Sequence, residues 1–177
     1  MILKNRTYAP ISDTLKEQLM RVEPSVDMHM EFRPCKVTLK NGEIFERVYV
    51  CESNSYIKIW GVWPEDDRGK RFILIQNVAD IEESKVRMPV RFANQMYEAG
   101  ESGMGYCIFT LVLKDGRKLP YLTGGAVDFV NWPPNVEPEM VAEILPHQGK
   151  EIFEQREADF YMQGAKYYWC LYSNSSD

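Results

Sequence analysis

Two turn pairs, each set beside apolar strand-like runs, constrain the fold of this chain more than any other feature. Asn41-Gly42 separates the runs 35–40 and 43–50, and Asp115-Gly116 follows the run 107–114. Asn-Gly and Asp-Gly tolerate the positive φ angles of a type I′ turn, which joins two antiparallel strands. The sequence therefore predicts two β-hairpins and a fold rich in strands.

Two further pairs of matching segments follow the hairpins in the same order. Trp63-Pro64 is matched by Trp132-Pro133, and Val78-Ala79-Asp80-Ile81 is matched by Val141-Ala142-Glu143-Ile144. The second copy is shorter between hairpin and closing segment, where the first copy carries a charged loop, and loops absorb such changes at small cost. Strand-turn-strand segments of β proteins resemble one another, but the shared order favours a tandem duplication.

Residue patterns outside the hairpins predict further elements. Helices are expected over 13–22, 89–99 and 150–163, and strands over 56–63, 72–75, 78–81 and 166–172. Thr14 and Glu17 have the spacing of a capping box in the first helix, and Phe92 and Met96 lie one helical turn apart in the second. The last strand is strongly aromatic, so it should dock on one of the other units or on another chain.

The L-x-[ND]-G turns and the closing Val-Ala-[Asp/Glu]-Ile segments resemble those of small SH3-like and Sm-like barrels. The resemblance covers residues 32–83 and 107–146 and consists of turns and strands rather than chemical motifs. It implies an α+β, mainly β protein with two SH3-like or Sm-like small barrels in tandem, a linking helix and a C-terminal helix. Such a fold does not by itself fix a function.

Five segments follow from this interpretation. They are an N-terminal segment with a short helix (1–27), a first small barrel unit (28–86), a linking helix and loop (87–105), a second, shorter barrel unit (106–149), and a C-terminal helix and aromatic strand packed on the barrels (150–177). Units of this size are marginally stable alone, so the two are expected to pack on each other.

The charge balance disfavours a broad nucleic-acid surface. The chain has 21 Lys and Arg residues against 26 Asp and Glu residues, a net charge of -5, whereas phosphate binding needs a basic footprint. Arg68, Lys70 and Arg71 form the densest basic cluster, but three acidic residues stand directly before it. Sm-like nucleic-acid binding through this loop and the Arg117-Lys118 turn is therefore a further alternative only.

No metal or cofactor site is expected. The four cysteines contain no C-x-x-C pair, and only His29 and His147 could add imidazole ligands. Cys51 and Cys107 lie in apolar runs, as is typical of buried thiols. The sequence has no apolar run that could span a membrane and no signal sequence at its start, so we expect a cytoplasmic protein with reduced thiols and no membrane partner.

Aromatic residues, 12% of the chain, indicate where a partner could bind. Alternation in the run 56–63 places Tyr56 and Trp60 outward if the intervening isoleucines form the core. With Trp63, and Trp132 of the second unit, they are predicted to contact a protein or peptide partner, or a second copy of the chain. The alternative is that the linking or C-terminal helix covers them. The predicted function is thus a non-enzymatic interaction module.

A small hydrolase-type enzyme is the alternative function. His147 follows Leu145-Pro146 in a predicted turn and could act as a general base with Asp128 or Glu143 as the orienting carboxylate. The spacing does not require these groups to meet, and a surface or helix-capping histidine is the simpler interpretation of His147. Convergence of the three side chains in one pocket would favour the enzyme, and wide separation would exclude it.

Overall fold

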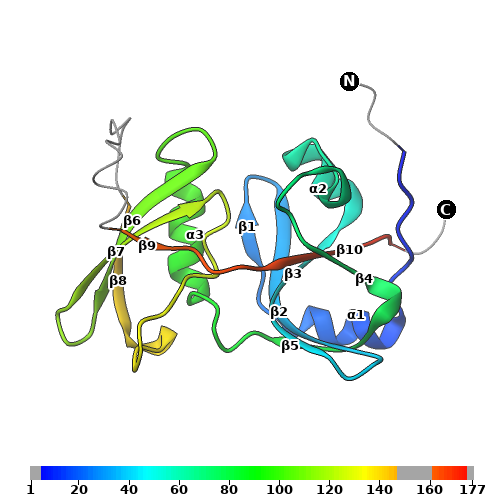
Figure 1. The fold of residues 1–177 in the computed structure, drawn as a ribbon, viewed down its shortest axis with the longest axis horizontal. Helices are drawn as coiled ribbons and strands as arrows, with labels where there is room; N and C mark the ends of the chain where they lie inside the picture. The colour runs from blue at the N-terminus through cyan, green and yellow to red at the C-terminus, as the bar shows by residue number, and fades with distance from the viewer. Residues whose placement is uncertain (1–4, 147–160, 175–177) are drawn as a thin grey trace. The chain divides into compact units, whose positions relative to one another are not determined.

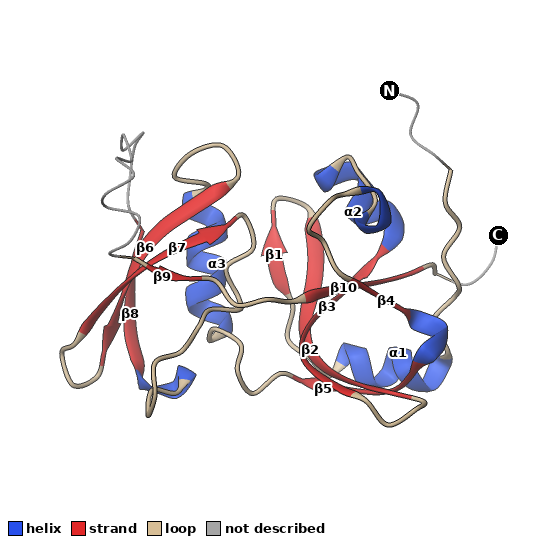
Figure 2. Cartoon of the chain, viewed as in Figure 1, coloured by secondary structure: helices blue, strands red, loops and turns tan. Residues whose placement is uncertain are grey.

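The computed structural model describes residues 5–146 and 161–174. The chain divides into two compact units (Figure 1). Unit 1 comprises Met1–Lys85 and Tyr167–Asp177, and unit 2 comprises Val86–Lys166. Each contains helices and one β-sheet, so the protein is α+β and mainly β (Figure 2).

Unit 1 holds a six-stranded sheet in which strand order does not follow sequence order. Its elements are α1 (Asp13–Met20), β1 (Ser25–Asp27), β2 (Met30–Leu39), β3 (Ile44–Glu52), α2 (Ser53–Trp60), β4 (Phe72–Leu74), β5 (Val78–Glu83) and β10 (Tyr168–Tyr172), with short 3-10 turns at Pro64–Asp66 and Ile75–Asn77. The strand order is β1-β2-β3-β10-β4, and β5 also pairs with β2. The C-terminal strand β10 runs parallel to both of its neighbours, β3 and β4.

The two helices of unit 1 lie on opposite faces of its sheet. On one face, α1 begins at Ser12, whose hydroxyl caps Leu15 N, and Gln18 bonds both the Asp80 side chain and Ile81 N of β5. On the other face, α2 covers the side chains of Tyr49 and its neighbours. The core on the α1 face consists of Ile11, Leu15, Leu19, Val22, Cys35, Val37, Val48, Val50, Ile73, Ile75, Val78, Ile81 and Cys170.

Unit 2 holds a four-stranded sheet with the order β8-β6-β7-β9. Its elements are α3 (Val90–Ala99), β6 (Tyr106–Leu113), β7 (Lys118–Gly124), a 3-10 turn at Pro138–Met140, β8 (Val141–Pro146) and β9 (Met162–Gln163). Phe92, Ala93 and Met96 form the buried stripe of α3, which packs into the core with Phe109, Leu111, Tyr121 and Ile144. The helix predicted over 89–99 is therefore confirmed, but it belongs to the core of unit 2.

The two predicted hairpins are present, but their turns are not of type I′. Gly42 N donates to Leu39 O and Leu39 N donates to Glu43 O, and the corresponding bonds join Leu113, Gly116 and Arg117. Only the glycine of each pair has a positive φ, +90° at Gly42 and +88° at Gly116. Each loop is a type I turn followed by a left-handed glycine, the three-residue hairpin with a G1 bulge.

The first strand of each hairpin also pairs with a closing strand, β2 with β5 and β6 with β8, and the registers of the two pairings are equivalent. Leu39 is the partner of Val78 in unit 1, and Leu113 is the partner of Val141 in unit 2. A register shift directly precedes both leucines. In each case a 3-10 turn leads into the closing strand. The sequence matches thus coincide with matching backbone pairings.

Several expectations need correction. Neither sheet closes into a barrel within the described residues, so two closed five-stranded barrels are not observed. The predicted strand 56–63 is wrong, because residues 53–60 form α2, capped by the Glu52 carboxylate on Asn54 N and Ser55 N. Most of the predicted helix 150–163 lies outside the described residues, and its end is wrong because Met162 and Gln163 form β9.

The aromatic C-terminal strand is confirmed and docks within the chain. Tyr168–Tyr172 inserts between β3 and β4 of unit 1. A few residues earlier, β9 pairs in parallel with β7 of unit 2. The outer edge of each hairpin's return strand is therefore covered by the same stretch of chain, which removes two edges that would otherwise be free to associate.

Candidate functional site

Trp169 of β10 is the centre of an aromatic cluster on the α2 face of unit 1. Its ring centroid lies 4.9 Å from those of Tyr49 and Tyr56, 5.5 Å from that of Trp60 and 6.0 Å from that of Phe32. Tyr49, Tyr56 and Trp169 have no exposed surface. The indole N–H groups of Trp60 and Trp169 have no acceptor among the described residues, so ring packing dominates this cluster.

Lys70 places an ammonium group on this cluster. Its Nζ atom lies 3.9 Å from the centroid of the Trp60 ring and donates to the Tyr56 hydroxyl at 3.1 Å. Asp67 provides the counter-charge at 3.0 Å. Burial lowers the pKa of Lys70, although Asp67 opposes this shift, and burial raises the pKa of Tyr56. The cation is thus held between a carboxylate and two aromatic rings.

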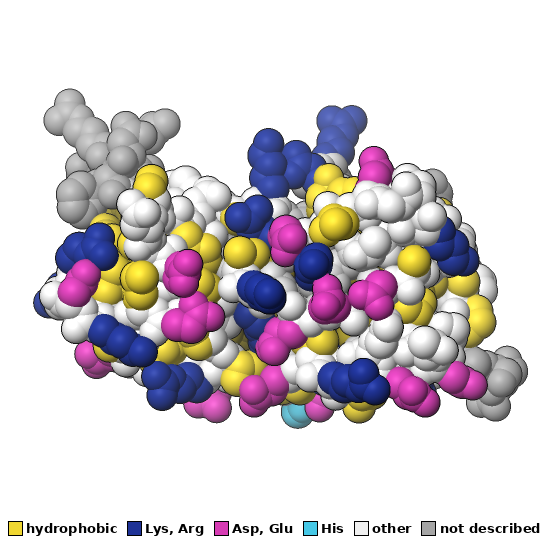
Figure 3. All heavy atoms as spheres, turned by 90° about the horizontal axis from the view of Figure 1, so that it is seen from below, with side chains coloured by type: hydrophobic (Ala, Val, Ile, Leu, Met, Phe, Trp, Pro, Cys, Tyr) yellow, Lys and Arg dark blue, Asp and Glu magenta, His cyan; other side chains and the backbone are white. Residues whose placement is uncertain are grey.

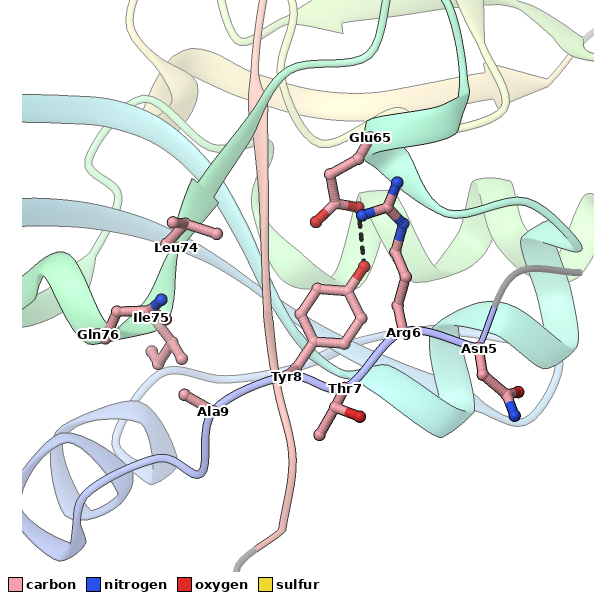
Figure 4. A pocket seen from close by; sticks show the side chains of 9 residues that line it. All are labelled: Asn5, Arg6, Thr7, Tyr8, Ala9, Glu65, Leu74, Ile75 and Gln76. Atoms are coloured by element: carbon pink, nitrogen blue, oxygen red, sulfur yellow. Dashed lines mark hydrogen bonds between the residues drawn. The ribbon is translucent and has the colours of Figure 1, made fainter.

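A polar pocket of about 340 Å³ lies between the N-terminal segment and the end of β4 (Figure 4). Tyr8 and Arg6 extend from that segment toward the 64–66 turn, where the Tyr8 hydroxyl donates to Glu65 at 2.8 Å and the Arg6 guanidinium makes two bonds to Asp66. Burial, followed by the bond to Glu65, raises the pKa of Tyr8. Leu74 lies on the opposite side of the pocket.

The strand β4 next to this pocket is the outer edge of the unit 1 sheet. No strand of the described residues pairs with its second edge. Trp169 N donates to Arg71 O at 2.9 Å, so Arg71 directs its carbonyl toward β10. Backbone groups of successive strand residues point to opposite sides, so the N–H and C=O groups of Phe72 and Leu74 point to the open edge.

The side chains of this edge are apolar and accessible. Phe72 is 44% exposed and Leu74 is 38% exposed. Phe72 is the register partner of Trp169, and Leu74 is the partner of Leu171. Register partners project from the same face of a sheet, so Phe72 and Leu74 lie on the face that carries Trp169 and α2. The edge and the aromatic cluster therefore form one continuous face.

The four aromatic residues predicted to bind a partner occupy different environments. Tyr56 was expected to point outward from a strand, which is wrong, because it is buried by the turn of α2 that faces the sheet. Trp60 is half-buried, and Trp63 is 8% exposed with its ring 5.3 Å from that of Tyr8. Trp132 belongs to unit 2, where its indole donates to Val86 O. The structure thus brings Tyr56 and Trp60 together, with ring centroids 6.0 Å apart.

The groups considered for a hydrolase are not assembled by the described residues. His147 lies outside them. Asp128 has no exposed surface, accepts a short bond from the Tyr97 hydroxyl and lies 3.9 Å from the Arg87 guanidinium. Glu143 is exposed on β8. Asp128 is thus committed to a buried ion pair in unit 2.

The remaining candidate residues, the cysteines, the potential metal ligands and the basic side chains, do not form a site within the described part of the chain. All four cysteines are buried, and burial raises the pKa of Cys51. The described part of the chain contains no cluster of three or more His, Cys, Asp or Glu residues suited to a metal ion. Arg117 of the second hairpin is paired with Asp115. Basic and acidic side chains are interspersed on the face shown in Figure 3.

Sequence reasoning missed the open edge. Residues 72–75 were expected to be an almost continuous apolar strand, but the structure buries only Ile73 and Ile75. The 3-10 turn that starts at Ile75 was also unforeseen. The strand is only three residues long, because the 3-10 turn at Ile75–Asn77 follows it directly.

Comparisons with known proteins give no match for this chain, whether to a family model, a curated protein or a solved structure. Within the described residues, no helix is both long and apolar enough to cross a bilayer.

Proposed function

We propose that this chain is a non-enzymatic protein that binds a protein or peptide partner by strand addition at the edge of the unit 1 sheet. The observation that carries the proposal is the open side of β4, where the backbone groups of Phe72 and Leu74 point outward beside accessible apolar side chains. An extended peptide that pairs with such an edge gains main-chain hydrogen bonds, and its alternate side chains provide specificity.

The aromatic residues extend this contact surface. Trp60 packs on Trp169, the register partner of Phe72, and Trp63 packs on Tyr8, which lines the adjoining pocket. We assign Trp60 and Trp63 to the rim of the partner site and Tyr56 to the support beneath it. Contact through Trp132 would be made separately by unit 2.

We infer that the two units arose by tandem duplication of a small barrel-like element of the SH3-like or Sm-like type. Support comes from the shared loop type at Gly42 and Gly116 and from the equivalent pairings of Leu39 and Leu113 with the closing strands. The two copies then differ most in the loop region that provides α2 and β4 in unit 1. The proposed site thus lies in the part that unit 2 lacks.

A selection from a library of displayed peptides tests the proposed function. We expect the selection to enrich peptides that bind the whole chain. These peptides should also bind the control variant Ile44→Glu, but they should not bind the variant Phe72→Glu. Ile44 is also an exposed apolar strand residue of unit 1, at 55% exposure, and lies away from β4. Failure to enrich any peptide, or equal binding to both variants, would contradict the proposal.

A further inference from the structure

We infer that the segment added to β4 is acidic, with apolar side chains on one face and carboxylates on the other. This inference rests on the proposed strand addition and specifies the chemistry of the partner. It follows from how β4 distributes apolar and basic side chains over its two faces, and from the way in which the neighbouring acidic residues are already paired.

The two faces of the β4 edge differ in character. Phe72 and Leu74 project from the face of Trp169, whereas Arg71, one position earlier, projects from the opposite face. The Arg71 guanidinium lies 6.0 Å from the centroid of the Tyr168 ring, on that opposite face. A strand placed beside β4 has the same period of two. The partner residues on the face of Phe72 and Leu74 should therefore be apolar. The alternate partner residues project from the opposite face, where they meet Arg71.

The charges around β4 leave two arginines available for an acidic partner. Three carboxylates precede the strand, and each has a donor: Glu65 accepts from Tyr8, Asp66 from Arg6 and Asp67 from Lys70. Arg68 and Arg71 are exposed and have no carboxylate partner among the described residues. The edge is thus locally basic although the chain is acidic overall. Complementary charge selects partners at such a surface.

Two synthetic peptides test the charge requirement. One alternates valine with glutamate and the other alternates valine with lysine, and each is titrated into the full chain while backbone amide signals are recorded by NMR. We expect the glutamate peptide to bind about tenfold more tightly at low salt and to lose this advantage at high salt, because exposed charges are screened. The amides of Phe72 and Leu74 should shift and become protected from exchange.

Charge reversal on the protein provides the matched control. The double variant Arg68→Glu/Arg71→Glu should prefer the lysine peptide, since the same edge would then present carboxylates. Both arginines are exposed, so the fold should be retained. An unchanged preference for the glutamate peptide would overturn the inference about acidity.

A proline variant tests strand addition itself. Leu74 has φ -79° and its N–H points to the open edge, so Leu74→Pro removes the outward donor without breaking a bond to β10. Leu74→Ala also loses the side chain but keeps the donor. We expect Leu74→Pro to abolish binding and Leu74→Ala to weaken it only partly. Equal binding by both would overturn strand addition.

The outcomes separate the two levels of the proposal. If neither synthetic peptide and no library peptide binds, both the proposed function and the inference about acidity fail. If both synthetic peptides bind with equal affinity through the Phe72 and Leu74 amides, strand addition stands and the acidic preference fails. If sedimentation shows a dimer of the unmodified chain that Leu74→Pro dissociates, the occupant is a second copy, and the acidic-peptide inference is overturned.

Discussion

The ammonium of Lys70 lies 3.9 Å from the centroid of the Trp60 ring, at the place where α2 covers the sheet of unit 1. The same ammonium donates to the buried Tyr56 hydroxyl and pairs with Asp67. The Lys70 ammonium therefore connects the loop that follows α2 to Tyr56 and Trp60, the aromatic residues of that helix. Since β4 begins two residues after Lys70, this contact also fixes the start of the proposed binding edge.

Removal of the Lys70 side chain should destabilise unit 1. We expect Lys70→Ala to lower the free energy of unfolding by about 1–2 kcal/mol, because a partly desolvated cation–π contact and a hydrogen bond are lost together. Urea unfolding followed by tryptophan fluorescence reports mainly on this unit, which contains Trp60, Trp63 and Trp169, whereas unit 2 contains Trp132. Lys58→Ala, an exposed lysine of α2, is the control. Equal stabilities of the two variants would contradict the assigned role.

The error at residues 56–63 has an identifiable physical cause. Tyr56, Ile57, Ile59 and Trp60 favour strands by intrinsic propensity, and their spacing over one or two turns fits a strand as well as a helix. The decisive signal was local: the Glu52 carboxylate accepts from two backbone N–H groups and caps α2. A short helix is determined by its cap and its tertiary contacts more than by propensity.

The positions of the hairpins were easier to predict from the sequence than the helix at 53–60, because a turn is determined by a few adjacent residues. Asn41-Gly42 and Asp115-Gly116 correctly marked both loops, but the loop type was not predicted, because a type I turn followed by a left-handed glycine accepts the same residue pairs as a type I′ turn. Asn41 and Asp115 instead use their side chains to accept from Glu43 N and Arg117 N. Such a bond stabilises the turn without a positive φ at the Asx residue.

Both hairpin glycines should resist replacement for reasons of backbone conformation alone. Their φ angles are near +90°, and an added Cβ atom would meet nothing within 4 Å. We therefore expect Gly42→Ala and Gly116→Ala each to cost about 1–2 kcal/mol, since a left-handed conformation is unfavourable for residues with a Cβ atom. Gly124→Ala is a matched control at a strand end without positive φ. Thermal unfolding of the three variants checks this, and a similar loss in Gly124→Ala would count against the conformational explanation.

The buried carboxylate of unit 2 leads to the largest expected loss. Asp128 is fully buried with Arg87 and Tyr97, so Asp128→Ala removes the carboxylate that faces the guanidinium and accepts from the Tyr97 hydroxyl. Removal of one partner of a buried ion pair typically costs about 3–5 kcal/mol. Amide exchange in β6 and β7 measures this loss locally. The exposed Glu143→Ala should change little, and equal exchange in both variants would show that the pair is not structural.

The candidate site was less predictable than the fold. The cluster depends on β10, which is far from α2 and β4 in sequence and inserts between β3 and β4. No local pattern indicates that Trp169 will lie against Tyr56, or that Phe72 will lie at an edge. The aromatic composition drew attention to Trp60 and Trp63, whereas the accessible apolar residues beside them, Phe72 and Leu74, belong to a strand only three residues long.

Alkaline pH should weaken unit 1 through its buried thiols. Burial raises the pKa of Cys170 from 9.0 to about 12, so between these values the unfolded chain has released a proton that the folded chain retains. The unfolded state then binds fewer protons, and the stability contributed by this thiol is present below pH 9 and lost as pH rises toward 12. The expected slope of the free energy of unfolding is about -1.4 kcal/mol per pH unit for one group.

Cys170→Ala removes that contribution, whereas Val50→Ala, at the paired position in β3, opens a cavity without removing a titrating group. Urea unfolding between pH 9 and 11 should show a shallower decline in Cys170→Ala than in Val50→Ala, and parallel declines in both would rule out the Cys170 thiol as the source.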